Sequence, residues 1–141
     1  LFAHVEEGGV LAFQIPSDKY ATVRLLLNEI AGAPPWRERL REARNALTIE
    51  EPKFYYEALA EQARTVDIWE TEYCHIMAGT NSIITWITST ALRPFLEALG
   101  NDMEREQFLD QLRERVGQSY EPCKNGKVLF PFRRLFVVAY R

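Results

Sequence analysis

Gly8-Gly9-Val10-Leu11-Ala12-Phe13-Gln14-Ile15-Pro16 is the stretch that decides the fold. A mostly apolar run bounded by glycines and a proline is typical of a short strand. The apolar residues of segment 19–31 then follow the i, i+3, i+4, i+7 spacing of one helical face: Val23, Leu26, Leu27 and Ile30. A strand that leads directly into a helix so close to Leu1 is expected in the middle of a fold. We therefore expect earlier elements of this fold to lie upstream.

Composition limits the class of protein. With 141 residues, 47% of them apolar, the chain is long enough for one ordinary core. A net charge of -3, with both signs interspersed, gives no basic stripe, so nucleic acid is not an expected partner. The longest uncharged stretch, residues 78–92, is shorter than the roughly 20 apolar residues that cross a bilayer, so no membrane partner is expected either. Without a basic leader, a cytoplasmic location is the default expectation.

The two cysteines, Cys74 and Cys123, lack the close spacing of a zinc site. Two isolated cysteines in an acidic protein favour reduced, buried thiols over a disulfide framework. No metal site is therefore expected.

Turn and breaker residues divide the rest of the chain. Helices are predicted over residues 36–47, 52–59, 80–87, 94–99 and 102–116, and strands over residues 65–77 and 128–139. The β-branched residues near Ile84 leave a strand open as the alternative for 80–87. Pro131 is expected to interrupt the last strand, at a bulge or an edge position. In this order the elements indicate an α/β sheet with a helical cap.

Four runs together carry a resemblance to a known family. They are residues 9–16 (GVLAFQIP), residues 66–73 (VDIWETEY), Thr85-Trp86 with residues 92–96 (LRPFL), and residues 132–139 (FRRLFVVA). In combination they closely resemble the carboxyl-terminal half of the trans-aconitate 2-methyltransferases, and the similarity extends over nearly all of the chain.

The resemblance implies a fold and separate regions for cofactor and substrate binding. It implies the carboxyl-terminal half of a doubly wound, Rossmann-like class I methyltransferase sheet, with residues 10–16, 65–77 and 127–140 as its fifth, sixth and seventh strands. Residues 79–123 would be a helical cap between the last two strands. The family's Asp-x-Gly-x-Gly loop is not in this sequence, so S-adenosylmethionine would be bound mainly by an upstream half. The segment before Gly8 is also shorter than the relatives usually have.

The implied reaction needs positioning more than acid-base chemistry. A carboxylate is already an ionised nucleophile at pH 7 because its pKa is roughly 4, so no catalytic base is required. Arginine suits the grip on a polycarboxylate because its planar fork meets a carboxylate in two charge-assisted hydrogen bonds. His75 is therefore interpreted as a structural group rather than a base.

Two arginines are predicted to bind substrate. Arg93 precedes Pro94 at a bend that would aim it into a cleft, although an arginine there also commonly bonds free carbonyls at a helix end. Of the neighbours Arg133 and Arg134, the period of two sends the side chains to opposite faces, so at most one enters a given cleft. Our prediction is Arg133.

Aromatic and amide side chains complete the predicted substrate site. Tyr55 and Tyr56 lie about 100° apart on a helix, so one packs inward while the other presents its hydroxyl, unless both are core residues. Trp86 is either a pocket wall or a core residue beside Ile83 and Ile87. Gln14 lies near the end of a strand, where open α/β sheets bind ligands.

Two functions are kept for the whole protein. The first is methyl transfer from S-adenosylmethionine to a carboxylate of a small polycarboxylic acid such as trans-aconitate, with this chain supplying the substrate-side cap. The alternative is a non-enzymatic binding or oligomerisation module that self-associates through the sheet edge at residues 10–16, because an unpaired edge strand is prone to association.

Overall fold

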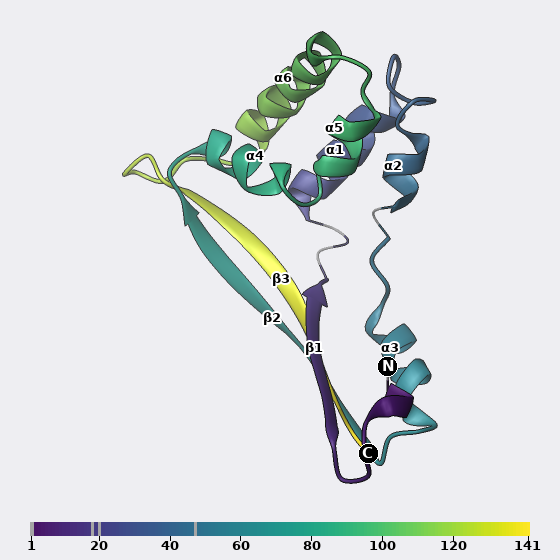
Figure 1. Cartoon of the computed structure of the whole chain (residues 1–141). Helices are drawn as coiled ribbons and strands as arrows, with labels where there is room; N and C mark the ends of the chain where they lie inside the picture. The colour runs from purple at the N-terminus through teal and green to yellow at the C-terminus, as the bar shows by residue number, and fades with distance from the viewer. Residues whose placement is uncertain (1, 18, 20, 47) are drawn as a thin grey trace. The chain divides into compact units, whose positions relative to one another are not determined.

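A computed structural model describes residues 2–17, 19, 21–46 and 48–141. The chain divides into two compact units. Unit 1 comprises Leu1–Lys19, Ile49–Tyr73 and Pro131–Arg141, and unit 2 comprises Tyr20–Thr48 and Cys74–Phe130. The elements of both units are labelled in Figure 1.

Unit 1 contains most of a three-stranded sheet. The strands of this sheet are β1 (Val10–Pro16), β2 (Thr65–Met77) and β3 (Val128–Tyr140), in the order β1-β3-β2. Residues 74–77 of β2 and 128–130 of β3 belong to unit 2. β1 and β3 are antiparallel, in a register that runs from Val10 opposite Tyr140 to Pro16 opposite Arg134. β2 also runs against β3 (Figure 1), so β1 and β2 point the same way.

One face of this sheet carries the core of unit 1. The 3-10 helix η1 (Phe2–His4) and helix α3 (Pro52–Ala60) provide Phe2 and Leu59, which pack against buried residues of β3. The buried β3 residues are Leu135, Val137 and Ala139. Because side chains alternate along a strand, only every second residue of each strand reaches this core, and Leu11, Phe13, Ile15, Val66 and Ile68 do so from β1 and β2.

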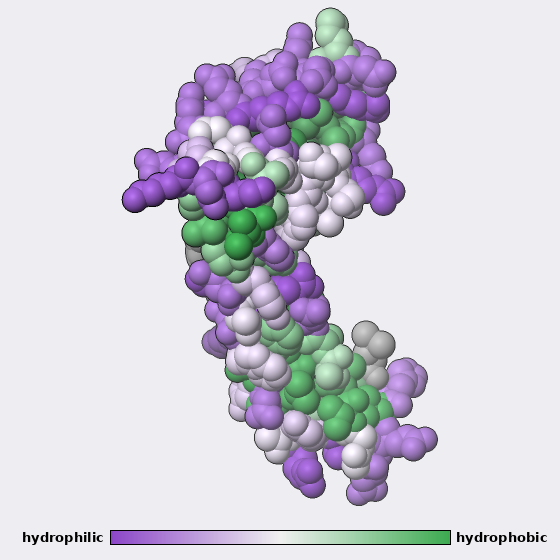
Figure 2. Space-filling view, turned by 90° about the vertical axis from the view of Figure 1, so that its left-hand side faces the viewer, coloured by the Kyte–Doolittle hydropathy of each residue, from purple (hydrophilic) through white to green (hydrophobic). Residues whose placement is uncertain are grey.

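The opposite face of the sheet, which we call the open face, has no such cover from the described residues of unit 1. It presents the alternate residues Val10, Ala12, Gln14, Pro16, Asp67, Trp69, Thr71, Tyr73, Phe132, Arg134, Phe136, Val138 and Tyr140, none of which is buried. Trp69 alone retains 46% of its accessible surface. Figure 2 shows apolar and near-neutral residues exposed over parts of the molecular surface.

Unit 2 is helical. It contains α1 (Thr22–Gly32), α2 (Arg41–Ala46), α4 (Thr80–Thr88), α5 (Arg93–Ala98) and α6 (Asp102–Ser119). α6 packs against α1 and α4, and its buried residues are Phe108, Leu112 and Val116. The Phe108 ring meets Trp36 edge-on and stacks on Phe95. The cap region expected over residues 79–123 lies inside this unit, which also takes in α1 and α2.

Hydrogen bonds from buried aromatic residues tie unit 2 together. Trp36 donates its indole Nε1–H to the Oε1 of Gln111 over 3.0 Å. The hydroxyl of Tyr120 accepts from the backbone N–H of Val23 over 3.1 Å. Each bond satisfies a polar atom at the edge of the core, which would otherwise cost free energy on burial.

The predicted elements are largely confirmed, with differences at proline-rich positions. The strand over 65–77 is confirmed to the residue, and 80–87 is helical rather than a strand. The helix predicted from Trp36 to Leu47 is wrong in extent, because residues 36–40 form turns after Pro34 and Pro35 and the helix spans only Arg41–Ala46. Leu47 lies outside the described residues.

Pro131 does not interrupt the last strand, contrary to the prediction, because β3 is continuous and central in the sheet. Its pairing with β1 ends at Arg134, however, and the next bond on that side joins the N–H of Ser17 to the carbonyl of Arg133. Pro131 therefore lies beyond the reach of β1, where its missing N–H removes no ladder bond. In this local sense the expected edge position is correct.

The sheet is antiparallel among the described residues, within a mixed α/β arrangement. The cysteines Cys74 and Cys123 are free, as expected, but both are exposed, so the prediction of buried thiols is wrong. Cys74 lies near the end of β2, and Cys123 lies in the turn region before β3.

Candidate functional site

Arg133 lies on the core face of the sheet, beyond the end of its apolar cluster. One of its Nη atoms bonds the Oε2 of Glu72 over 3.2 Å, and the other lies 4.0 Å from the Oε2 of Glu70. Both carboxylates come from β2, on the side of the strand that carries Val66 and Ile68. The charge of Arg133 is thus already balanced, and a bound carboxylate would have to displace or share these partners.

Arg93 begins helix α5 and is exposed. Its Nε bonds the Oε1 of Glu97, one turn later, over 2.7 Å. That hydrogen bond raises the pKa of Arg93 above its already high usual value, so the side chain is cationic at every physiological pH. Arg93 belongs to unit 2, whereas Arg133 belongs to unit 1.

The two neighbouring tyrosines of α3 separate as the 100° rotation predicts. Tyr55 packs against the unit 1 core, with its ring edge-on to Phe13 and Phe54 at centroid distances of 5.8 and 5.2 Å. Burial, with a smaller contribution from the charge of Glu50, raises the pKa of Tyr55. Tyr56 is 53% exposed and is the one of the pair that presents its hydroxyl to solvent.

Trp86 is exposed on α4, although Ile83 and Ile87 on the same helix are buried. Its ring contacts His75 of β2 at 5.6 Å and Phe130 of β3 at 5.4 Å between centroids. With 36% of its surface exposed, it is both a packing residue of unit 2 and a partly accessible aromatic wall.

Gln14 is exposed on the open face, near the carboxyl end of β1. Because Arg133 lies on the core face, the structure places these two predicted substrate residues on opposite sides of one sheet. Arg134, the neighbour that was not predicted to bind substrate, shares the face of Gln14. The alternation of side chains along a strand correctly predicted that Arg133 and Arg134 lie on opposite faces, but the sequence did not show which face is covered.

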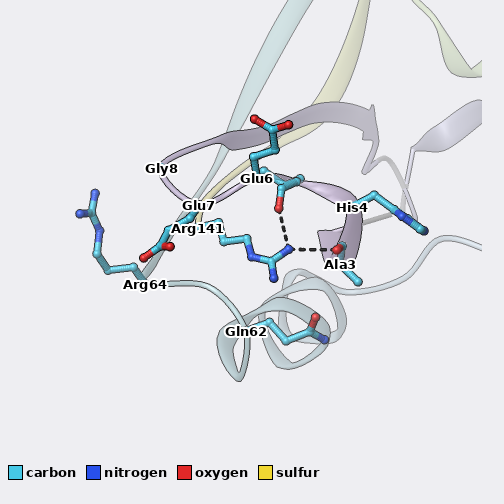
Figure 3. A pocket seen from close by; sticks show the side chains of 9 residues that line it. Ala3, His4, Glu6, Glu7, Gly8, Gln62, Arg64 and Arg141 are labelled. Atoms are coloured by element: carbon cyan, nitrogen blue, oxygen red, sulfur yellow. Dashed lines mark hydrogen bonds between the residues drawn. The ribbon is translucent and has the colours of Figure 1, made fainter.

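A polar recess that sequence reasoning missed lies at the other end of these strands. It measures about 810 Å³ and is lined by residues of η1, the following turn and the ends of α3 and β3. Figure 3 shows the guanidinium of Arg141 inside it, where Nη1 donates to the carbonyls of Ala3 and Val5, while Arg64 points away. Arg141 thus fastens η1 to the sheet, which indicates a structural role for the recess.

Neither a metal centre nor a membrane span adds to these candidates. Within the described ranges, no group of His, Cys, Asp and Glu side chains is arranged to hold a metal ion. None of the helices that the structure describes combines the length and the apolar character of a membrane span.

Known proteins resemble this chain over its whole length. A trans-aconitate 2-methyltransferase of Azoarcus sp. (strain BH72) is 38% identical over 141 residues, which are 100% of this chain and 54% of that protein. The one of Acidovorax ebreus is 40% identical over 137 residues, 95% of this chain and 52% of that protein. The one of Agrobacterium fabrum is 35% identical over 142 residues, which cover 100% of this chain and 55% of that protein. No protein-family model matches the chain.

The chain is a relative of the trans-aconitate 2-methyltransferases. The resemblance carried by residues 9–16, 66–73, 85–96 and 132–139 is thereby confirmed. The chain spans about half the length of the curated trans-aconitate 2-methyltransferases it matches. The activity of a whole protein is therefore a matter for proposal.

Proposed function

We propose that the full-length protein transfers the methyl group of S-adenosylmethionine to a carboxylate of trans-aconitate. This chain supplies the substrate-side cap, residues 79–123, and one edge of a doubly wound sheet whose remaining strands lie upstream. The observation that carries the proposal is the match of 35–40% identity along the whole chain to enzymes named for that reaction.

The residues of this chain do not themselves fit the cofactor. A phosphate- or nucleoside-binding turn between strand and helix normally uses glycine, yet β1 leads into α1 through residues 17–21, which contain none. We therefore assign cofactor binding to the upstream polypeptide. When bound there, S-adenosylmethionine supplies an electrophilic methyl group. The contribution of this chain is to hold and orient the acceptor.

Orientation is the main task because the acceptor needs no activation. A carboxylate is ionised at pH 7, and holding it in line with the methyl group supplies roughly 7–11 kcal/mol of the barrier reduction. The predicted contacts are tested one at a time: Arg93 or Arg133 for a carboxylate, Tyr56 or Gln14 for a polar atom, and Tyr55 or Trp86 for the carbon frame. Gln14 and Arg133 lie on opposite faces of the sheet, so they do not hold one molecule together. No side chain of this chain is assigned as a base.

Isothermal titration of the full-length protein with trans-aconitate and with S-adenosylhomocysteine tests this proposal. Both ligands are expected to bind, and the methyl ester is expected as product in a turnover assay followed by mass spectrometry. Binding of neither ligand would refute the proposal. Binding of the nucleoside alone would keep the methyltransferase class and reject trans-aconitate as the acceptor.

A second candidate rests on the position of β1. This strand is at the end of the sheet and pairs only with β3 among the described strands, so its other edge could join a second chain. Sedimentation of the 141-residue chain alone distinguishes the two candidates. A stable, defined assembly favours a self-associating module, whereas unfolding or aggregation favours part of an enzyme.

A further inference from the structure

Arg134 occupies a particular place in the sheet. It lies on the central strand β3, directly opposite Pro16, the last residue of β1. Its side chain is on the open face, because Leu135, Val137 and Ala139 take the alternate positions into the core. Open α/β sheets bind ligands beyond the carboxyl ends of strands that point the same way, and here β1 and β2, which flank β3, point the same way. Arg134 is therefore level with the end of β1 at that rim.

The guanidinium of Arg134 is held but not neutralised. Its Cζ lies 5.4 Å from the centroid of the Phe132 ring. Its Nε is buried and has no hydrogen-bond partner. Among the residues that the structure describes, no carboxylate lies within ion-pairing distance of Arg134, whereas Arg133 has Glu72 and Arg93 has Glu97. A guanidinium that no carboxylate neutralises binds an anion through strong charge-assisted hydrogen bonds.

We propose that Arg134 binds a carboxylate of the polycarboxylate substrate on the open face of the sheet. The inference rests on the function proposed above and deepens it by naming an anion-binding residue. Gln14 lies opposite Phe136, two positions from the Pro16–Arg134 pair on the same face, so its amide is a diagonal neighbour of the guanidinium. The cation and the amide together offer donors to one acid.

The surroundings of Arg134 favour this role. The cation–π contact with the Phe132 ring restrains the guanidinium, so less conformational freedom is lost when a carboxylate binds. The Phe132 ring keeps water away from one side of the guanidinium, which strengthens a charge-assisted bond. Arg133 meets the same acid less readily, because Glu72 and Glu70 already accept its donors.

The test uses the full-length protein and three variants. Arg134→Gln removes the charge and the fork, and Arg134→Lys keeps the charge but not the fork. Arg64→Gln removes an arginine of the same unit at the opposite end of the strands and serves as the matched control. Each protein is titrated with trans-aconitate and, separately, with S-adenosylhomocysteine, and its melting temperature is recorded.

The expected result is a loss of trans-aconitate affinity of about 10- to 100-fold in Arg134→Gln, as for removal of one charged hydrogen bond. Arg134→Lys should lose less, and Arg64→Gln should match the wild type. Affinity for S-adenosylhomocysteine and melting temperature should be unchanged in all three.

Unchanged affinity of Arg134→Gln for trans-aconitate overturns the inference. So does a fall in melting temperature together with nucleoside affinity, because that would show Arg134 paired with a carboxylate of the upstream polypeptide. If Arg134→Gln does not fold, Arg134→Lys decides by the same criteria. Failure of the wild type to bind trans-aconitate would instead refute the proposed function, so the two failures are distinguishable.

Discussion

Trp69 of β2 and Phe136 of β3 stack on the open face, with ring centroids 5.2 Å apart and planes inclined by 7°. A cross-strand aromatic pair contributes about 0.5–1.5 kcal/mol beyond the area it buries. This pair joins the edge strand β2 to the central strand where no described helix of unit 1 covers them.

A double-mutant cycle measures this stack. Trp69→Leu and Phe136→Leu keep an apolar side chain and remove one ring each. We expect a coupling free energy of about 0.5–1.5 kcal/mol from urea unfolding of the full-length protein, followed by circular dichroism. Additive single effects would show that the rings contribute only through their apolar area.

The start of α6 depends on one amide side chain. Asn101 accepts the backbone N–H of Glu104 on its Oδ1 over 2.9 Å, which satisfies a donor that the first helical turn leaves free. Asn101→Ala should lower the free energy of unfolding by about 1 kcal/mol, and Asn101→Ser, which keeps an oxygen at that position, should lower it much less. Equal losses in the two variants would contradict a capping role.

Glu104 should make stability depend on acid pH. A hydrogen bond from Arg39, assisted by the backbone N–H of Gly100, holds the pKa of Glu104 below its usual range. A carboxyl group whose pKa is lower in the folded state adds stability above its unfolded pKa of about 4.3, and that stability is lost as the pH falls through the folded pKa.

The measurement compares melting temperatures of wild type and Glu104→Gln between pH 7 and pH 3. The wild type should be more stable at pH 7, and the difference should shrink below about pH 4. A difference that stays constant over this range would mean that ionisation of Glu104 is not the cause.

Phe108 tests the core of unit 2. It is fully buried between Trp36, which it meets at 5.6 Å, and Phe95, on which it stacks at 6.1 Å between centroids. Phe108→Ala should cost about 3–5 kcal/mol because it removes the ring and leaves a cavity. Met103→Ala on the same helix, where the side chain is 67% exposed, should stay within about 0.5 kcal/mol of the wild type.

Replacing Arg93 tests directly whether it contacts the substrate. Arg93 is exposed and Arg113 is partly buried; both belong to unit 2 and are paired with carboxylates in solvent-accessible ion pairs, so their loss changes stability little. Arg93→Gln should weaken binding of trans-aconitate to the full-length protein about tenfold, and Arg113→Gln should not. Equal affinities in the two variants would remove Arg93 from the site.

Periodicity predicted the elements well because it reports which side of each element is buried. The strand over residues 65–77 and the helix face with Val23, Leu26, Leu27 and Ile30 are examples. Periodicity did not predict the direction and the order of the strands, because these depend on contacts between residues far apart in the chain. The same limit applies to the choice between Arg133 and Arg134, whose alternation was evident but whose covered face was not.

The sequence patterns also failed to predict some local features. Residues 36–40 have helical spacing, but the preceding prolines leave them in turns. Cys74 was predicted to be buried from its residue type, whereas it is exposed near the end of β2. Arg141 was not selected, because nothing in the sequence shows that its donors meet the carbonyls of Ala3 and Val5.

The distribution of indoles gives a spectroscopic consequence. The sequence has three tryptophans, and Trp69 is the one that belongs to unit 1, since Trp36 and Trp86 lie in unit 2. With Trp36 and Trp86 replaced by phenylalanine, the 141-residue chain would emit from Trp69 alone. The emission wavelength and the quenching by acrylamide would then show directly how far water reaches the open face of the sheet.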